Sequence, residues 1–506
     1  MARFAAIDVG SNATRLLLAE AEDPDGIRMV ESYREAVRLG TSVFLTGRLE
    51  PSAIEGVIEA LKGFRKLLAE EEVTSHRAVV TASARDAVNS DELLSRAENE
   101  AGIRLEAISG TEEARIVKLA VETVIPLGGY RALLVDLGGG SLEISEVHHD
   151  EVRFSASLDI GTVRLLESFL SSNEPVSAES ERLLVEYIDR HLDPISDDYR
   201  RRRYDLVAGT GGNFEALARL CPVPAEDHPT IDIGLARALL SRMKALTPAE
   251  RAAAYDLRAD RADVIVPAAY AVLAVADLAR TDRIVAPGVG LKEGMIVELV
   301  RRHFGTWDAF DEENATSRAA VQLGRRFHFD EPHATQVDRL ACALFDNLAP
   351  LHELGTGDRR LLRIAALLHD IGDFISAPAH HKHSQYIIEN SDLMGLSKDE
   401  RAIVAAVARY HRRAMPSAKH AAYKRLGTAD RRRVRKLAAI LRVADALDRG
   451  HRSKVRSLDV SLRNGEVMIA PHGLDLALEV WTARRKAELF ERTFERRLEF
   501  VLPEDR

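Results

Sequence analysis

The stretch that decides the fold is ALLVDLGGGSLEIS, residues 132–145. Its apolar start runs into Asp136, three glycines follow at positions 138–140, and apolar and polar side chains then alternate around Glu143. This order predicts two antiparallel strands joined by a tight turn. A glycine-rich turn without a ligand remains the alternative at this point.

The predicted turn has the chemistry of a phosphate site. Glycines let backbone N–H groups approach an anion closely, and such groups form an anion-binding cradle. Asp136 and Glu143 flank the turn, and carboxylate oxygens together with water are the ligands that Mg²⁺ prefers. The candidate phosphate-binding residues are Gly138, Gly139, Gly140 and Ser141.

The same pattern occurs near the N-terminus, 128 residues earlier. Apolar residues 4–7 lead into Asp8, and a second apolar run begins at Leu16. One copy could arise by chance, but two indicate duplicated halves that face each other across a cleft. The equivalent candidates are Gly10, Ser11 and Asn12 for phosphate and Asp8 for the metal.

Length and composition limit the class of protein. A chain of 506 residues is too long for one hydrophobic core and predicts three or four domains. Apolar residues make up 46% and charged residues 29%, which is typical of a folded globular protein. The net charge of −9 argues against a general nucleic-acid-binding surface, although a local basic channel is compatible with it.

We expect a cytoplasmic protein without a membrane partner. Cys221 and Cys342 are the only cysteines, which excludes a disulfide framework and favours a reducing compartment. The N-terminal sequence lacks the apolar region of a signal peptide. The longest apolar run, residues 264–276, contains Pro267 and is too short to cross a bilayer.

Two further turns carry residues that suit phosphate. Small residues after a predicted strand at 78–80 lead to Arg85, whose guanidinium group can bind phosphate oxygens with two hydrogen bonds. A solvated arginine at a helix start is the alternative. Gly211 and Gly212 precede another predicted helix and are a weak signal for an anion at its N-terminus.

Residues 109–115 open a helix with two glutamates in its first turn, Glu112 and Glu113. A buried carboxylate here could accept a proton, but a capping box and the helix dipole would also explain both residues.

From about residue 306 helical periodicity dominates, so we place a domain boundary there. This segment holds most of the histidines. Strands return after residue 457, with a hairpin turn at 464–465, a helix over about 474–494 and a strand over 498–501.

Seven motifs follow in a fixed order: FAAIDVGSNATRL, VVTASARDA, ISGTEEARI, LLVDLGGGSLEIS, SLDIGTVRL, VAGTGGNFEAL and APGVGLKEGM. Together they resemble the exopolyphosphatase/guanosine pentaphosphate phosphohydrolase family of the actin-like ATPase-domain superfamily. The resemblance implies an α/β fold with two ribonuclease-H-like domains, an all-α HD-like domain and a small α+β C-terminal unit. The expected bounds are 1–126 and 127–304 for the actin-like domains, 305–455 for the HD-like domain and 456–506 for the last unit.

The resemblance also implies an activity and a division of roles. The reaction would be the Mg²⁺-dependent release of terminal phosphate from inorganic polyphosphate, or hydrolysis of the 5′ γ-phosphate of pppGpp to ppGpp. Arg85 would stabilise charge on the terminal phosphoryl group, and by match to the motif SGxEEA, Glu113 would be the base with Glu112 as fallback. The metal ligands would be Asp8, Asp136 and Glu143. A homodimer is compatible with the resemblance, and no nucleic-acid partner is expected.

The helical segment resembles the family's HD-type domain and carries the order H…HD…H…H…D of metal-dependent HD phosphohydrolases. Within the phosphatase family this domain is regarded as a structural and substrate-channel element. The complete set therefore means either a retained site for divalent metals or a polar cluster packed by hydrogen bonds. Its members are His333, His369, Asp370, His383, His411 and Asp445.

Residues 423–436 hold seven basic side chains against one acid, Asp430. Such runs usually form a solvated helix face, but local positive charge also suits a channel for a linear polyanion. The candidate channel residues are Lys424, Arg425, Arg431, Arg432, Arg433 and Arg435.

We therefore predict an exopolyphosphatase. The alternatives are a pppGpp 5′-phosphohydrolase that uses the same site and a non-catalytic sensor of polyphosphate or nucleotide. The candidate base argues against the sensor, because a binding module has no use for one.

Overall fold

The computed structural model describes residues 1–41, 43–170, 174–200, 202–307, 309–391, 393–412, 414–463 and 465–501. The chain divides into two compact units, Met1–Asp308 and Ala309–Arg506. The predicted change of character near residue 306 lies close to this division. The finer boundaries expected at 126/127 and 455/456 stay predictions.

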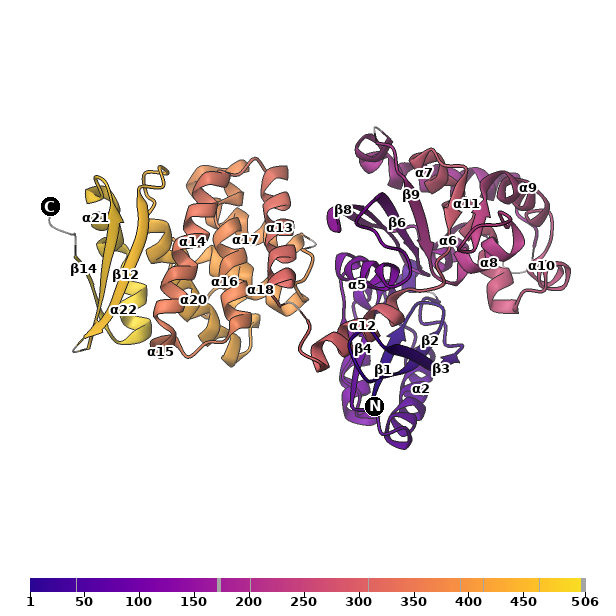
Figure 1. Cartoon of the computed structure of the whole chain (residues 1–506), viewed down its shortest axis with the longest axis horizontal. Coiled ribbons are helices and arrows are strands. Elements are labelled where there is room, and N and C mark those ends of the chain that lie inside the picture. Colours follow the sequence, from indigo (N-terminus) through magenta and orange to yellow (C-terminus); the bar gives the residue numbers. More distant parts are fainter. Residues whose placement is uncertain are drawn as a thin grey trace. The chain divides into compact units, whose positions relative to one another are not determined.

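The N-terminal unit contains two sheets of the same plan (Figure 1). In each, three antiparallel strands are followed by two parallel ones, and the second sheet adds an antiparallel edge strand, β10. The strand orders are β3-β2-β1-β4-β5 and β8-β7-β6-β9-β11-β10. The first sheet comprises β1 (Ala2–Val9), β2 (Thr14–Ala21), β3 (Ile27–Glu35), β4 (Ser75–Val80) and β5 (Glu106–Ala107). The second comprises β6 (Arg131–Leu137), β7 (Leu142–His148), β8 (Glu151–Leu158), β9 (Leu206–Thr210), β10 (Thr230–Asp232) and β11 (Arg283–Val285). The matching orders confirm the predicted duplication.

Helices surround both sheets of this unit. Apolar residues at helical spacing over 51–72 predict an amphipathic helix, and the structure confirms it as Pro51–Glu70, with a proline in its first turn, where the missing N–H costs nothing. Those of the first half are α1 (Val43–Thr46), α2 (Pro51–Glu70), α3 (Ala82–Asp86), α4 (Ser90–Ala101) and α5 (Gly110–Glu122). Those of the second are α6 (Thr162–Phe169), α7 (Ala178–Arg200), α8 (Gly212–Leu220), α9 (Ile233–Met243), α10 (Pro248–Tyr255), α11 (Ala259–Ala279) and α12 (Leu291–His303).

Helices α5 and α12 join the two halves. A side chain at Gly294 of α12 would place its Cβ 2.0 Å from the carbonyl oxygen of Ile116, so the two helices touch through their backbones. One buried cluster around them combines Phe4 of β1 with Leu134 of β6. The halves therefore share a core, and Figure 1 shows α5 and α12 between the two sheets.

Helix α11 extends beyond both ends of the apolar run at residues 264–276, which the sequence analysis judged too short to cross a bilayer. It is the one helix among the described residues that is long and apolar enough to cross a membrane, but 83% of its most apolar window is buried inside the protein. This burial is typical of a core helix, and the helix packs against α6, α7 and α9.

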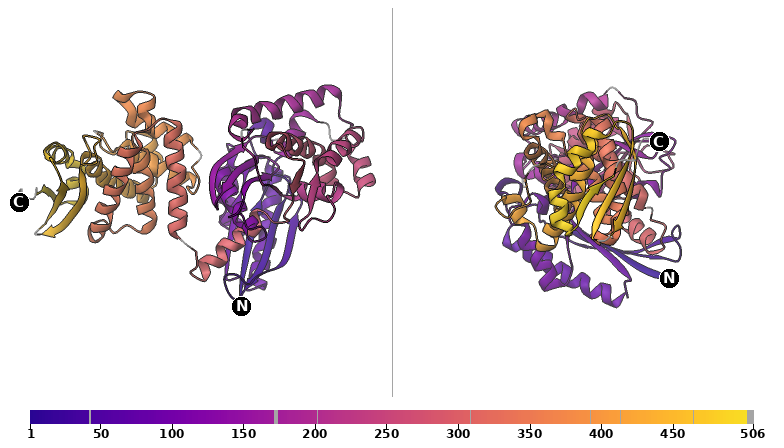
Figure 2. Two further views of the ribbon diagram at one scale, coloured as in Figure 1. Left: turned by 45° about the horizontal axis from the view of Figure 1, so that its top comes forward. Right: turned by 90° about the vertical axis from the view of Figure 1, so that its left-hand side faces the viewer.

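The C-terminal unit is a helical bundle that continues into a small sheet (Figure 2). Its helices are α13 (Ala309–Arg326), α14 (Glu331–Asn347), α15 (Ala349–His352), α16 (Thr356–Leu368), the 3₁₀ turns η1 (Ile371–Phe374) and η2 (Ala377–Ala379), α17 (His380–Asn390), α18 (Lys398–Arg409), α19 (Ala421–Arg425) and α20 (Thr428–Ala446). The last part comprises β12 (Val455–Arg463), β13 (Glu466–Gly473), α21 (Ala477–Lys486), α22 (Glu488–Phe494) and β14 (Arg497–Phe500). One continuous buried cluster runs from the helices into this sheet.

The structure confirms one sequence prediction for this part of the chain and contradicts another. The predicted hairpin is confirmed, since Arg463 and Glu466 pair at the end of two antiparallel strands; Asn464 of its turn lies outside the described residues. The single helix expected over 474–494 is wrong: the structure has two helices. The N–H of Ala487 bonds to the carbonyl of Arg484, a tighter turn that interrupts the α-helical ladder.

Candidate active site and a second cluster in the helical unit

The two Asp-x-Gly turns have the same geometry. Each connects an antiparallel strand pair, β1 with β2 and β6 with β7. The N–H of Gly10 donates to the carbonyl of Ala13 at 3.1 Å, and the N–H of Gly138 donates to the carbonyl of Ser141 at 3.0 Å. The sequence repeat is thus also a structural repeat.

The two turns lie against each other. A Cβ at Gly139 would come within 2.8 Å of the Cβ of Ser11, and one at Gly140 within 2.6 Å of the Cβ of Ala82. The hydroxyl of Ser83 donates to that of Ser11 at 2.9 Å in a buried position. Only glycine permits so close an approach, and the predicted phosphate-binding turns of the two halves therefore meet in one place.

The residue opposite the aspartate differs between the two copies. Asp8 pairs across the strands with Arg15, whose Nη1 lies 3.1 Å from its Oδ2. Asp136 pairs with a second carboxylate, Glu143. Burial raises the pKa of Asp8, and the charge of Arg15 opposes that shift. One copy of the turn therefore carries an ion pair and the other an uncompensated pair of acids.

Glu113 from α5 completes a group of three carboxylates with Asp136 and Glu143, called the carboxylate triad below. One oxygen of each lies within 4.8 Å of the others. All three residues are buried. The Oε2 atoms of Glu113 and Glu143 have no hydrogen-bond partner among the described residues. Ser157 donates to the other oxygen of Glu143 at 2.8 Å, and Thr210 donates to Asp136 at 2.6 Å.

The pKa values of all three carboxyl groups of the triad are raised. Burial, with the charges of Glu143 and Asp136, raises the pKa of Glu113 well above its ordinary value. Burial raises the pKa of Asp136 to about 6, against the hydrogen bond from Thr210, and burial together with Asp136 raises that of Glu143 to about 7. Three buried acids with two unpartnered oxygens fit a divalent cation such as Mg²⁺, which would remove the repulsion between them. Asp8, the third expected ligand, is not a member of this group.

Glu112 and Glu113 have separate environments. The Ser109 side chain caps α5 by accepting from the N–H of Glu112 at 3.2 Å. The Glu112 carboxylate accepts two hydrogen bonds from Arg115, both at 2.7 Å, and one from Arg77 at 3.3 Å. Burial alone would raise the pKa of Glu112, but these two cations lower it. Glu112 is therefore an ion-pair residue, and Glu113 is the carboxylate available for chemistry.

Arg85 lies within electrostatic range of the carboxylate triad. Its charge lowers the pKa of both Glu113 and Glu143 against the effect of burial. The side chain is one quarter exposed and donates a long hydrogen bond of 3.4 Å to the carbonyl of Ile108.

Gly211, just before α8, lies beside Asp136 of the triad. Gly211 has a φ of +92°, which a side chain would strain, and a Cβ there would lie 3.5 Å from Oδ1 of Asp136. A Cβ at Gly212 would lie 2.4 Å from a guanidinium nitrogen of Arg261. Both glycines are therefore required by their surroundings, and their role in phosphate binding stays a prediction.

Two arginines that the sequence predictions did not include belong to this region. Arg15 lowers the pKa of Asp136, and Arg261 of α11 donates a hydrogen bond to Asn213 at the start of α8. Burial and the nearby positive charge of Arg15 lower the pKa of Arg261 to about 10. The signal for Arg15 was available, because it stands at the same place in the repeat as Glu143. No local pattern singles out Arg261.

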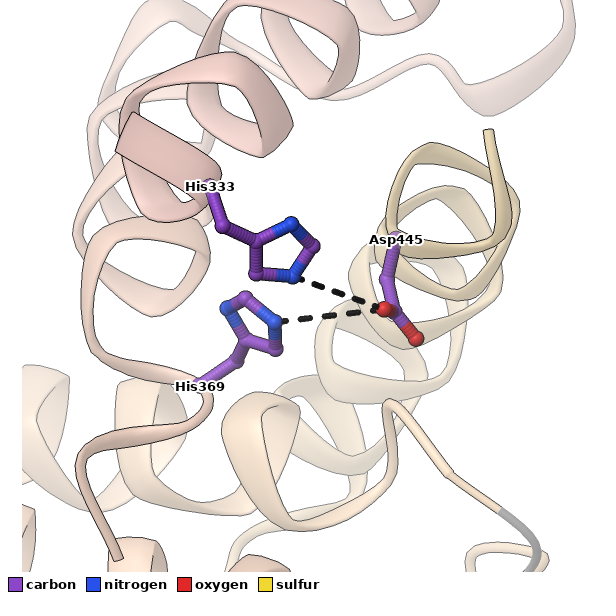
Figure 3. Close-up of side chains that lie close together, drawn as sticks. All are labelled: His333, His369 and Asp445. Carbon is purple, nitrogen blue, oxygen red and sulfur yellow. Dashed lines mark ion pairs between the residues drawn. The ribbon is translucent and has the colours of Figure 1, made fainter. Parts of the chain in front are cut away.

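The helical unit brings six of its polar side chains together, called the histidine cluster below: His333, His369, Asp370, His380, His411 and Asp445. Figure 3 shows His333 and His369 directed at Asp445. The structure corrects one expected member, since His380 and not His383 lies beside Asp370. His383 is one turn further along α17. Its Cβ packs against Gly372 and would lie 2.8 Å from a Cβ at that position.

Two of the six candidate channel residues, Arg431 and Arg433, make contacts within the C-terminal unit. Arg433 forms ion pairs with Asp358 at 2.6 Å and Asp430 at 3.1 Å, and Arg431 donates to the carbonyl of Leu426. The remaining candidate channel residues, Lys424, Arg425, Arg432 and Arg435, are exposed.

Comparison with known proteins gives consistent matches. Residues 18–303 match the model of the Ppx/GppA phosphatase family, and residues 316–479 match Ppx/GppA phosphatase, domain III. A relative from Aeromonas hydrophila subsp. hydrophila, named guanosine-5′-triphosphate,3′-diphosphate pyrophosphatase, is 28% identical over 442 residues, which is 87% of this chain and 86% of its own. A relative of the same name from Vibrio parahaemolyticus is 27% identical and covers 82% of this chain and 81% of its own.

Two solved structures are also similar. The crystal structure of the Ppx/GppA family member from Aquifex aeolicus is 30% identical, with a TM-score of 0.51, and covers 60% of this chain and 98% of its own. The structure of an exopolyphosphatase from Cytophaga hutchinsonii is 26% identical, with a TM-score of 0.55, and covers 59% of this chain and 98% of its own.

Proposed function

The chain belongs to the Ppx/GppA phosphatase family and is a phosphoanhydride hydrolase, and on that premise we propose that it removes the terminal phosphate of inorganic polyphosphate. The observation that supports this proposal is the carboxylate triad beside the two meeting glycine turns. Hydrolysis of a phosphoanhydride requires neutralised phosphate oxygens, a positioned water and an acceptor for its proton. The residues at this place offer each of these.

Asp136 and Glu143 would hold the metal ion. Bound there, Mg²⁺ would neutralise charge that develops on the transferred phosphoryl group. Thr210 and Ser157 fix one oxygen of each carboxylate and leave the other oxygens free to turn toward a cation. Asp8 is held by Arg15 and would reach the metal ion through water.

Glu113 would accept the proton of the attacking water. Its buried Oε2 has no partner among the described residues, and its raised pKa favours a group that takes up a proton during turnover. The capping alternative is weaker for Glu113, because the Ser109 cap involves the N–H of Glu112.

The two turns would hold the phosphate chain. Backbone N–H groups of the glycine turns and the side-chain N–H groups of Asn12 would donate to phosphate oxygens at this junction. Arg85, Arg15 and Arg261 would supply the positive charge that an oligophosphate needs.

Two comparisons support different substrates on the same site. The exopolyphosphatase from Cytophaga hutchinsonii matches the fold, whereas relatives that align over more than four fifths of this chain carry the pppGpp-directed name. We place polyphosphate first because the exposed basic residues of α19 and α20 suit a long polyanion. Hydrolysis of pppGpp to ppGpp is the second candidate.

The deciding experiment compares Glu113→Gln with Glu112→Gln. The first variant should lose at least about 100-fold in kcat with little change in KM, because only the proton acceptor is removed. The second should keep kcat within a few-fold and instead unfold more easily, because Arg77 and Arg115 each lose one of their carboxylate partners. Near wild-type turnover by Glu113→Gln would contradict the assignment.

Phosphate release from long-chain polyphosphate, pppGpp and ATP, measured side by side with Mg²⁺, tests the substrate. A higher kcat/KM for polyphosphate supports the first proposal, and a higher value for pppGpp supports the second. Binding of either without turnover would support a sensor in place of an enzyme acting on that substrate.

A further inference from the structure

The histidine cluster lies in the core of the helical unit, where isolated polar groups are costly. The side chains of His333, His369 and His411 are at most 3% exposed. They come from separate elements: α14, the residue after α16, and the end of α18. Six polar side chains brought from distant sequence positions to one buried place require a physical reason.

All four imidazoles are oriented in the same way. The Nδ1 of His369 faces the carbonyl of Ala366 at 2.7 Å, that of His411 faces Ala408 at 2.6 Å, and that of His380 faces Ala377 at 2.9 Å. The Nδ1 of His333 faces the Asp448 carboxylate at 2.8 Å. The Nδ1 of His380 also lies 2.8 Å from the Asp373 carboxylate and, more distantly, 3.4 Å from a guanidinium nitrogen of Arg412. Because the nearest partner of each ring can only accept, Nδ1 carries the proton in all four rings. The lone pair of every neutral ring is then on Nε2, as in histidines that bind metals.

The Nε2 atoms converge without satisfying one another. Those of His380 and His411 are 3.2 Å apart, and two lone pairs at that distance repel unless a cation lies between them. The Nε2 atoms of His333 and His369 are buried and make no well-aligned hydrogen bond among the described residues, although Oδ2 of Asp370 lies 3.3 Å from that of His369. A cluster packed only by hydrogen bonds would leave no such atoms.

Asp370 stands between two groups of ligand atoms. Its Oδ1 lies 3.2 Å from Nε2 of His380 and 3.3 Å from that of His411. Its Oδ2 lies 3.3 Å from Nε2 of His369 and 3.9 Å from that of His333. Asp445 faces the second group, with Oδ1 3.9 Å from His333, while Lys486 holds its other oxygen.

The separations of 3.2 to 3.3 Å around Asp370 correspond to the edges of metal coordination polyhedra, whereas those of 3.9 Å from His333 to Asp370 and Asp445 would have to shorten by about 0.5 Å when a metal binds. Ligand nitrogens at about 2.1 Å from a metal lie about 3 to 3.5 Å from one another. We propose that the helical unit binds two divalent transition-metal ions, one at His333, His369 and Asp445 and one at His380 and His411, with Asp370 bridging them. Imidazole nitrogen favours Mn, Fe, Co, Ni or Zn over Mg²⁺, so this centre is chemically distinct from the all-oxygen carboxylate triad.

The test is the metal content of the full-length protein without a histidine tag, after treatment with a chelator, reloading with Co²⁺ and dialysis. The wild type should retain two equivalents beyond any bound at the triad and show a visible Co²⁺ absorption band. Asp370→Asn should lose both. His383→Ala is the matched control, since this neighbouring histidine lies outside the cluster, and it should retain the metal. Glu143→Gln, which alters the triad, should also retain it.

A second variant separates binding from folding. Asp448→Asn keeps the ligands and weakens only the acceptor of the His333 N–H, so the affinity for Co²⁺ should fall by about 10- to 100-fold. Co²⁺ should also raise the Tm of the wild type but not that of Asp370→Asn, because only a bound ligand stabilises the folded state. The proposal is overturned if the wild type retains no more metal than Asp370→Asn, or if Asp448→Asn and His383→Ala bind equally well.

Discussion

Arg15 and Glu143 occupy the same position in the two copies of the Asp-x-Gly turn, and each faces the aspartate of its own copy across an antiparallel strand pair. The duplicated fold thus keeps the geometry and reverses a charge. One half presents a guanidinium group beside Asp8, and the other adds a carboxylate beside Asp136. Under the proposed function, the half with Arg15 would face the phosphate and the half with Glu143 would face the metal ion.

Replacement of Arg15 by methionine tests the half that would face the phosphate. Asp8 would remain buried without its partner, so the free energy of unfolding should fall by about 1–3 kcal/mol. KM for polyphosphate should rise as well, because a cation near the triad is lost. The double variant Asp8→Asn with Arg15→Met should recover stability in urea unfolding but not KM. Recovery of both would mean that Arg15 serves Asp8 alone.

Gly139→Ala tests the contact between the two turns. Its methyl group would lie 2.8 Å from the Cβ of Ser11, and relief of this overlap must move one turn away from the other. We expect a loss of about 1–3 kcal/mol in stability and a lower kcat. Gly129→Ala is the control, because a Cβ there would meet nothing within 4 Å. Equal behaviour of the two variants in thermal unfolding and phosphate release would contradict the close approach.

The pH dependence of stability tests the carboxylate triad without a substrate. The pKa of Asp136 is raised to about 6 and that of Glu143 to about 7, both above their unfolded values. The folded protein therefore binds protons first, and the associated stability, complete at low pH, is lost as pH rises through 6 and 7. The metal-free wild type should lose more unfolding free energy between pH 6 and 8 than Glu143→Gln.

Mg²⁺ should abolish most of that difference, because the cation replaces the protons between the carboxylates. Urea unfolding at pH 6, 7 and 8, with and without Mg²⁺, provides the measurement. Titrating groups outside the triad contribute about equally to both proteins, so parallel pH profiles for the wild type and Glu143→Gln would show that the three carboxylates do not repel one another.

Local patterns in the sequence predicted the hairpin at 132–145, its N-terminal copy and the long helix at Pro51–Glu70, because each depends on neighbours within a few residues. Local patterns left Glu112 and Glu113 as alternatives, and only the family resemblance favoured Glu113. The physical difference depends on contacts of Glu112 with Arg115 and with Arg77 of a preceding strand. Arg261 reaches Asn213 from another helix, a contact that no local periodicity records.

The histidine cluster shows the same limit. The order of histidines and aspartates along the chain indicated a cluster, but it could not distinguish His380 from His383. That choice depends on the rotation of α17 against Gly372, where a side chain would collide with the carbonyl of His380 at 2.2 Å. Helix phase is set by such packing contacts and not by the spacing of the ligands.

The exposed basic residues of α20 allow a test of substrate binding apart from the chemical step, because their replacement should change KM but not kcat. Charge reversal of Arg432 and Arg435 should raise KM for long-chain polyphosphate several-fold and leave kcat unchanged, since both side chains are exposed. Arg433→Ala should act differently: it breaks ion pairs with Asp358 and Asp430 and should mainly lower the Tm. The effect of the reversal should diminish at high salt, as expected for screened surface charges, and should be smaller for pppGpp than for long chains. An unchanged KM for polyphosphate at low salt would show that this face is only a solvated helix surface.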